Sequence, residues 1–92
     1  MNEIRKGKEM FYVGKSEEEY LAVITYKKVD DKTIKADHTF VSEQLRGQKI
    51  AKKLLNELVS FARENGYKII PECSYVKKVF ENSTEYRDII KI

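Results

Sequence analysis

The chain has 92 residues, of which 41% are hydrophobic and 36% are charged, a composition typical of a small water-exposed domain, and we expect one domain over residues 1–92. No apolar run approaches the roughly 20 residues that span a membrane, and a single cysteine, which has no partner for an internal disulfide, suits the reducing cytoplasm. The net charge of +3 is mild and fits an anionic small ligand as well as nucleic acid.

The first part of the chain predicts strands. Residues 3–8 are polar and should be extended or frayed, and residues 10–13 favour a first strand. The strongest strand pattern covers residues 20–29, where both alternating sets of side chains are fairly apolar, as expected of a central strand covered on both faces. Residues 30–32 then predict a short hairpin connection.

The next strand is predicted over residues 33–41. Its alternation places four side chains on one face, namely Ile34, Ala36, His38 and Phe40. The strand therefore carries the only histidine on a largely apolar face.

The second part of the chain predicts helices around one short strand. Apolar residues recur at helical spacing from Ile50 to Ala62, which predicts a main helix over residues 46–65 that Asn65 and Gly66 end. A short buried strand follows at 67–71, then a short helix at 74–81 and a last turn from Thr84. This order indicates an α+β (α/β) fold with a mostly antiparallel sheet, in which 33–41, the main helix and 67–71 form a βαβ-like unit.

The junction between strand 33–41 and the main helix is a candidate anion site. A chain that turns through Gly47 into a helix leaves backbone N–H groups unpaired at the positive end of the helix dipole. Arg46, Lys49, Lys52 and Lys53 add positive charge. Many helices begin after a glycine and bind nothing, so the pattern alone leaves both interpretations open.

Two further residues have useful chemistry. Imidazole is the side chain most often used as a general base, so His38 is a candidate, although a hydrogen-bonded core histidine is the plainer interpretation. Cys73 follows a strand end and is expected at a helix N-terminus, where a thiolate is favoured, although lone cysteines are usually buried hydrophobes. One histidine and one cysteine form no ligand cluster, so no metal site is expected.

These segments carry a resemblance to a known family. Residues 46–51, Arg-Gly-Gln-Lys-Ile-Ala, resemble motif A of the GNAT superfamily of acyl-CoA-dependent N-acetyltransferases, with Lys49 where the middle glycine usually stands. Residues 38–41 before the motif and residues 71–75 after it make the chain similar to the minimal, YjdJ-like GNAT proteins. The resemblance implies splayed strands 33–41 and 67–71, one main helix and a short C-terminal helix.

The resemblance also implies a cofactor site for acetyl-CoA or coenzyme A. The pantetheine arm would pair with backbone of Phe40, Val41 and Ser42, and the pyrophosphate would rest on N–H groups of residues 46–51: Arg46, Gly47, Gln48, Lys49, Ile50 and Ala51. His38 would take a proton from the amine. Cys73 would protonate the departing thiolate or briefly accept the acetyl group. The tyrosine that many GNAT enzymes use as an acid falls at Phe80, with Tyr75 as a substitute.

The implied function is transfer of an acetyl group from acetyl-CoA to a primary amine of a small molecule, a polyamine or a protein. The alternatives are a non-catalytic coenzyme A-binding module and a small basic RNA-binding domain, since six tyrosines and four phenylalanines could stack on bases. Nucleic acid is disfavoured, because the aromatic strand motif of RNA-binding sheets is missing and the net charge is low. We expect a monomer or weak dimer without membrane contact.

Overall fold

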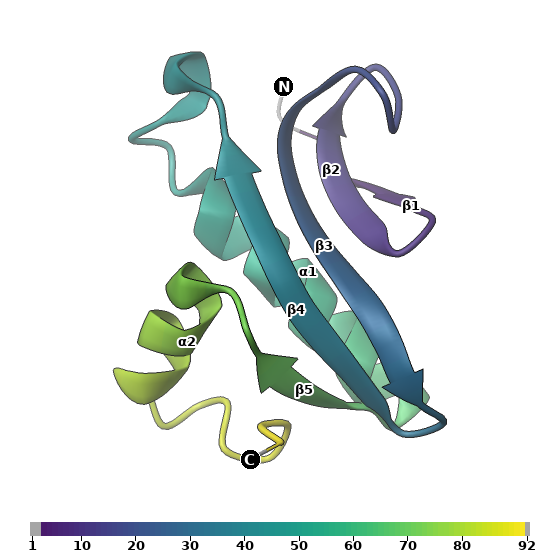
Figure 1. Ribbon diagram of the computed structural model, residues 1–92. Coiled ribbons are helices and arrows are strands. Elements are labelled where there is room, and N and C mark those ends of the chain that lie inside the picture. The colour runs from purple at the N-terminus through teal and green to yellow at the C-terminus, as the bar shows by residue number, and fades with distance from the viewer. Residues whose placement is uncertain (1–2, 92) are drawn as a thin grey trace.

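A five-stranded sheet with a long helix across one face organises the chain (Figure 1). The computed structural model describes residues 3–91. The strands are β1 (Arg5–Gly7), β2 (Met10–Gly14), β3 (Tyr20–Asp30), β4 (Thr33–Val41) and β5 (Lys68–Pro71). The helices are the 3-10 turn η1 (Glu43–Leu45), α1 (Ile50–Asn65) and α2 (Ser74–Glu81). The expectations for residues 1, 2 and 92 lie outside the described residues.

The strands lie in chain order across the sheet, β1-β2-β3-β4-β5. Neighbours from β1 to β4 pair antiparallel, whereas β4 and β5 pair parallel across the α1 connection. The predicted α+β fold with a mostly antiparallel sheet is therefore confirmed, and so is the neighbouring placement of β4 and β5. No helix in residues 3–91 is long and apolar enough to cross a bilayer.

The core lies between α1 and the sheet. The predicted apolar stripe of α1 is buried, with Leu54, Leu55 and Leu58 fully enclosed. These side chains meet the inward-facing residues of the strands, which include Phe11, Ala22, Ile24, Tyr26, Ile34 and Ala36. Val76 and Phe80 of α2 join the same cluster, so both helices stabilise the same side of the sheet.

The other face of the sheet carries no helix over β2, β3 and β4 in the described residues (Figure 1). A small separate cluster of Met10, Tyr12 and Val23 is buried there by neighbouring side chains, while Leu21 remains 39% exposed. The prediction that β3 is covered on both faces was therefore wrong for this face. The apolar residues of the sheet cover one another there, and no second layer is needed to bury Val23.

Backbone conformation sets both ends of α1. The helix begins at Ile50, four residues later than predicted, because Gly47 and Lys49 adopt positive φ values of 86° and 59°, which an α-helix does not allow. At the other end Gly66 has φ 73°, and the Tyr67 N–H donates to the Ala62 carbonyl at 2.8 Å. The predicted stop is thus confirmed.

The segment after α2 folds back onto the outer edge of β5. The Ile69 N–H donates to the Ile89 carbonyl at 2.6 Å, and the Lys91 N–H donates to the Ile69 carbonyl at 2.8 Å. Arg63 on α1 holds this segment with two hydrogen bonds to the Asp88 carboxylate, at 2.9 and 3.0 Å. The ion pair therefore links the C-terminal segment to the main helix.

Acid should loosen this segment. Arg63 lowers the pKa of the Asp88 carboxyl, and a carboxyl with a lower pKa in the folded state stabilises that state at neutral pH. The contribution is lost as pH falls from the unfolded pKa, about 4, through the lower folded value. We expect the protection of the Ile69 and Lys91 amides, which is their exchange rate compared with the intrinsic rate at each pH, to fall over that range more than that of Ile24 in the core. Asp88→Asn should abolish the dependence, and an unchanged dependence in that variant would contradict the assignment.

Candidate functional site

The strands β4 and β5 separate after a short paired region. Residues Thr33 to Ala36 pair with Lys68 to Pro71, and the Ala36 carbonyl then accepts the N–H groups of Glu72 at 3.1 Å and Cys73 at 2.8 Å. β4 continues to Val41 while the chain turns away into α2 (Figure 1). Within residues 3–91 the β5-facing edge of residues 37–41 has no strand partner, so the predicted divergence is confirmed.

A β-bulge lies where the two strands separate. Thr25 pairs with His38 and Tyr26 with Ala36, which leaves Asp37 as an extra residue in β4. The Thr25 hydroxyl donates to the Asp37 carboxylate at 2.5 Å. An extra residue reverses the alternation of side chains beyond it, so His38 and Phe40 lie on the face opposite Ala36. The prediction that these residues share the face of Ile34 and Ala36 was therefore wrong.

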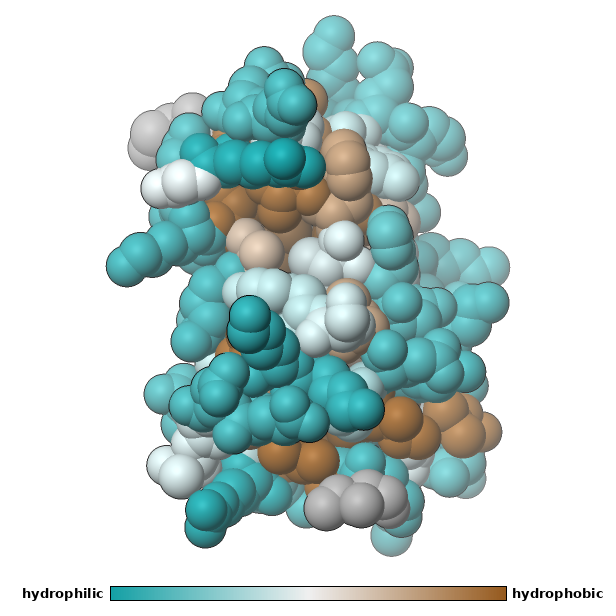
Figure 2. Space-filling view, turned by 60° about the vertical axis from the view of Figure 1, so that its left-hand side comes forward, coloured by the Kyte–Doolittle hydropathy of each residue, from teal (hydrophilic) through white to brown (hydrophobic). Residues whose placement is uncertain are grey.

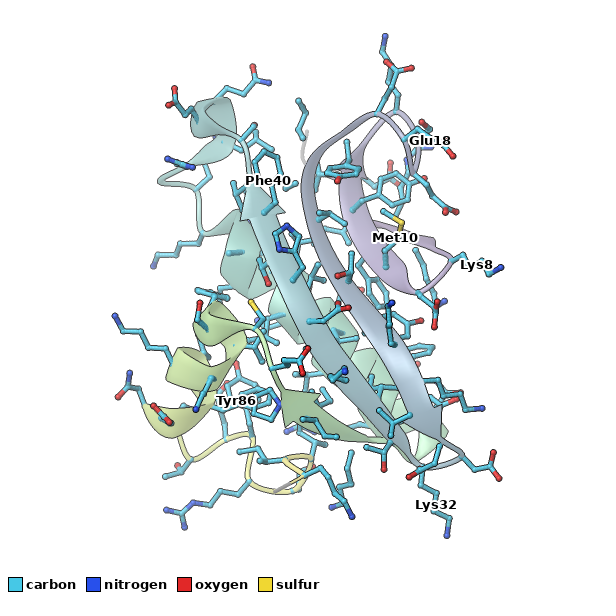
Figure 3. All side chains as sticks on the ribbon, in the orientation of Figure 1. Lys8, Met10, Glu18, Lys32, Phe40 and Tyr86 are labelled. Carbon is cyan, nitrogen blue, oxygen red and sulfur yellow. The ribbon has the colours of Figure 1, made fainter. Side chains whose placement is uncertain are left out.

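The bulge puts the two predicted catalytic residues on different sides of β4. His38 is exposed on the face without a helix, where Figure 3 shows Phe40 further along the strand. Cys73 is half-buried at the N-cap of α2, as expected of a helix N-terminus, and packs against the helix-side core. Its thiol donates to the Thr39 hydroxyl at 3.4 Å. Sequence reasoning missed Thr39, since strict alternation gives it the wrong face.

The loop between β4 and α1 holds the other predicted residues. The side chain of Leu45 is buried and fixes the loop to the core, and Arg46 donates from Nε to the Val41 carbonyl at 3.3 Å. A Cβ at Gly47 would contact no other atom, so space does not require glycine here. Glycine is favoured because φ is 86°, a conformation that other residues rarely adopt. Lys49 has the left-handed conformation, φ 59° and ψ 31°, that glycine adopts without steric cost.

The start of α1 offers backbone N–H groups to a ligand. Lys49 is the N-cap, no side chain of the described residues caps the helix, and the first N–H groups of a helix have no partner within it. The Ile50 side chain is buried, so this residue offers only its backbone. The Ser42 hydroxyl oxygen is buried without a hydrogen-bond partner in residues 3–91. A ligand with several acceptor atoms therefore fits this loop.

A groove of about 420 Å³ lies beside the start of α1. Its lining comes from α1, α2 and the following turn: Lys52, Tyr75, Lys78, Val79, Asn82 and Ser83. Burial raises the pKa of Tyr75, so its hydroxyl remains protonated at neutral pH. Figure 2 looks onto this edge of the molecule and shows apolar surface in its upper half between hydrophilic side chains.

Two aromatic residues, Tyr86 and Phe80, lie next to residues that line the groove. Figure 3 shows Tyr86 beside α2, where its hydroxyl donates to the Asn56 side chain at 3.1 Å. The Lys52 ammonium lies 5.7 Å from the Tyr86 ring, and interaction with the Tyr86 hydroxyl raises the pKa of Lys52. Phe80 is buried and stacks on Tyr86 at 5.0 Å between ring centroids, so this position supplies no acid.

Comparison with known proteins gives this geometry a family context. The sequence profile described as GCN5-related N-acetyl-transferase matches residues 10–89. An alignment 62 residues long, which covers 62% of this chain, is 37% identical to N-acetyltransferase 8 of Homo sapiens. The chain spans 27% of the length of that curated relative.

Solved structures show the same fold. A GCN5-like protein from Staphylococcus aureus, studied in solution, is 46% identical and superimposes with a TM-score of 0.83 over 98% of this chain and 88% of its own. A GNAT family acetyltransferase from Elizabethkingia anophelis, crystallised with acetyl-CoA bound, is 18% identical, with a TM-score of 0.58 over 79% of this chain and 50% of its own. The latter likeness concerns the fold alone.

Replacing Lys49 with glycine should stabilise the protein. A left-handed conformation costs an L-residue roughly 1–2 kcal/mol, and the greater freedom of glycine in the unfolded chain offsets about 0.4–1 kcal/mol of the gain. We expect Lys49→Gly to raise the free energy of unfolding in urea by up to about 1 kcal/mol. Lys49→Ala removes the charge, keeps Cβ and should give no such gain. Equal stability of the two variants would contradict the prediction, because it would show that the left-handed conformation costs no more than the freedom of glycine in the unfolded chain.

Proposed function

Because the chain belongs to the family of GCN5-related N-acetyltransferases, we propose that it transfers an acetyl group from acetyl-CoA to a primary amine of a small molecule, a polyamine or a protein. The observation that carries the proposal is the separation of β4 from β5 after Ala36, directly beside the uncapped start of α1. Coenzyme A matches these two features, because its extended pantetheine arm suits the free edge of β4 and its pyrophosphate suits the start of α1.

The residues of this region fit coenzyme A. The pantetheine arm would pair along the free edge of β4 at Phe40 and Val41, as an added strand would. Ser42, the third predicted residue of this edge, does not offer its N–H group, because that group donates to the Leu21 carbonyl at 2.8 Å. The pyrophosphate would accept hydrogen bonds from N–H groups at the start of α1, at the positive end of the helix dipole. The Arg46 N–H, which was predicted to join them, donates to the Glu43 carbonyl at 3.2 Å, so Arg46 would contribute its charge. Lys52 and Lys78 in the adjacent groove would lie near the remaining phosphate of coenzyme A.

The chemistry needs one proton removed and one supplied. Acetyl-CoA contributes the activated acetyl thioester; the amine nitrogen forms a bond to the acetyl carbon, and the bond from that carbon to sulfur breaks. His38, exposed on one side of β4, takes the proton from the amine directly or through water. Cys73, on the other side, protonates the departing thiolate or briefly accepts the acetyl group. The neutral hydroxyl of Tyr75 is a second possible proton donor.

One observation favours a second function. Phe80 replaces the tyrosine that would protonate the thiolate, and its ring is buried. A chain that binds coenzyme A without catalysis would share every feature of the cofactor region. Turnover with amines separates this possibility from the transferase.

The setting completes the proposal. A single free cysteine suits the cytoplasm, and the domain over residues 1–92 would act as a monomer or weak dimer. The acceptor is free to approach the exposed side of β4, since no described helix lies over it.

Coenzyme A should raise the melting temperature. A ligand that binds the folded state alone adds about 2.7 kcal/mol of stability at one hundred times its dissociation constant. Gly47→Val should abolish the thermal shift, because valine resists the φ of 86° that shapes the loop. Gly66→Val is the matched control, since Gly66 has φ 73°, equally open surroundings and a place at the far end of α1.

The control variant should lose stability and keep the full shift with coenzyme A. No shift with millimolar coenzyme A in the unaltered protein would refute the proposed cofactor.

His38 and Cys73 should be needed for turnover. A positioned acid or base contributes roughly 100- to 10,000-fold in rate, so His38→Ala and Cys73→Ala should each lower kcat by about that factor. Both variants should retain the thermal shift with coenzyme A. Cys73→Ser separates the two roles of the thiol, because a hydroxyl is a poor acyl acceptor without a strong base.

Near-normal kcat in Cys73→Ser would exclude an obligatory acetyl-cysteine. Near-normal kcat in both alanine variants would overturn the catalytic assignment and leave a site that acts by orientation.

A further inference from the structure

We propose that the open face of the sheet binds the acceptor, and that this acceptor is a small primary amine carried on an aromatic or aliphatic chain. The inference rests on the proposed acetyl transfer and adds the class of amine. Its basis is the coincidence of an exposed apolar surface with His38 and Asp37 on one side of β4.

The apolar surface is concentrated at one end of the sheet. Three large hydrophobic side chains are exposed there, Tyr20 at 38%, Leu21 at 39% and Phe40 at 41%. The rings of Tyr20 and Phe40 meet edge to face with centroids 6.3 Å apart. Figure 3 shows Phe40 and Met10 on this face, and Met10 belongs to the buried cluster of the same face. Exposed apolar side chains that lie together in this way are typical of interaction sites and ligand-binding grooves.

The surface continues into a hollow beside β3. Tyr20 and Leu21 line a space of about 560 Å³, large enough for a phenyl or short alkyl group. Its charged lining comprises Glu3, Arg5, Lys15 and Glu19, two of each sign. The hollow therefore selects by apolar contact and shape, without preference for a second charge.

The polar end of the surface suits an ammonium group. His38 lies two residues before Phe40 on the same face, and Asp37 places a carboxylate beside it at the bulge. Asp37 attracts the protonated amine, and His38 then accepts a proton from it. The backbone of Phe40 lies in the plane of the sheet, at the proposed pantetheine edge, while its ring stands on the open face. The thioester and the apolar chain of the amine would thus meet at this residue.

Other occupants match this surface less well. A polyamine needs unopposed carboxylates along its length, whereas the path from Asp37 runs over Phe40 and Tyr20. In the hollow at its end, Arg5 and Lys15 oppose the two carboxylates. Single-stranded RNA could stack on Tyr20 and Phe40, but Asp37 and the acidic turn at residues 17–19 repel phosphates.

Kinetics with a matched pair of amines test the proposal. The protein should prefer 2-phenylethylamine over ethylamine by at least about tenfold in kcat/KM, because only the former buries a ring. The double variant Tyr20→Ser and Leu21→Asn should lose roughly that factor with 2-phenylethylamine, mainly through KM, and should lose much less with ethylamine. Val29→Asn is the control, since Val29 is 53% exposed at the opposite end of β3. Equal use of the two amines would overturn this inference and leave the transferase intact.

A binding measurement keeps the test independent of turnover. With coenzyme A present, millimolar 2-phenylethylamine should shift the amide NMR signals of Leu21, Val23 and Phe40 and leave that of Val29 in place. The double variant should not respond. Shifts without acetylation of any amine would refute the transferase and support the amine surface. Absence of shifts at these three amides would overturn the surface, whatever the turnover.

Discussion

The carbonyl of Ala36 is the constraint on which the site depends. It accepts the N–H groups of both Glu72 and Cys73, which ends the pairing of β5 with β4 and turns the chain into α2. β5 has already ended at Pro71, and the next two N–H groups turn back to Ala36 instead of continuing along β4. Within residues 3–91, β4 therefore keeps a free edge over residues 37–41. The same turn fixes Cys73 at the start of α2. The divergence of the two strands thus follows from hydrogen-bond geometry at one residue.

Because of the neighbouring bulge, the side chains of residues 38–40 in β4 face two different environments. Thr39 and Cys73 contact each other on the side of the helices, whereas His38 and Phe40 stand on the open side. Side chains on both faces of β4 would reach a cofactor arm that lies along the edge of the strand. Under the proposed function, this division would let one strand serve the thioester and the amine.

Local patterns predicted the elements well and the long-range features poorly. The bounds of β4 and α2 match the prediction, because alternation and helical spacing depend only on residues that are close together in the sequence. The bulge at Asp37 depends on the register with β3 and on the Thr25 hydroxyl, so strict alternation put His38 on the wrong face. The start of α1 was misplaced because Lys49, unlike glycine, gives no signal of a positive φ. The contact of Thr39 with Cys73 depends on the bulge in β4 and on the turn after β5, and neither is visible in the local sequence pattern.

Strain and unsatisfied groups are concentrated in the loop that precedes α1. Lys49 is held in a left-handed conformation, and the Ser42 hydroxyl is buried without a hydrogen-bond partner in the described chain. Each is unfavourable by itself, and strained residues persist only where surrounding packing determines them. That packing is supplied by the buried Leu45 on one side and by Ile50 with the apolar stripe of α1 on the other. The core therefore holds the loop in a conformation that the loop residues themselves disfavour. This conformation suits a ligand that is rich in hydrogen-bond acceptors.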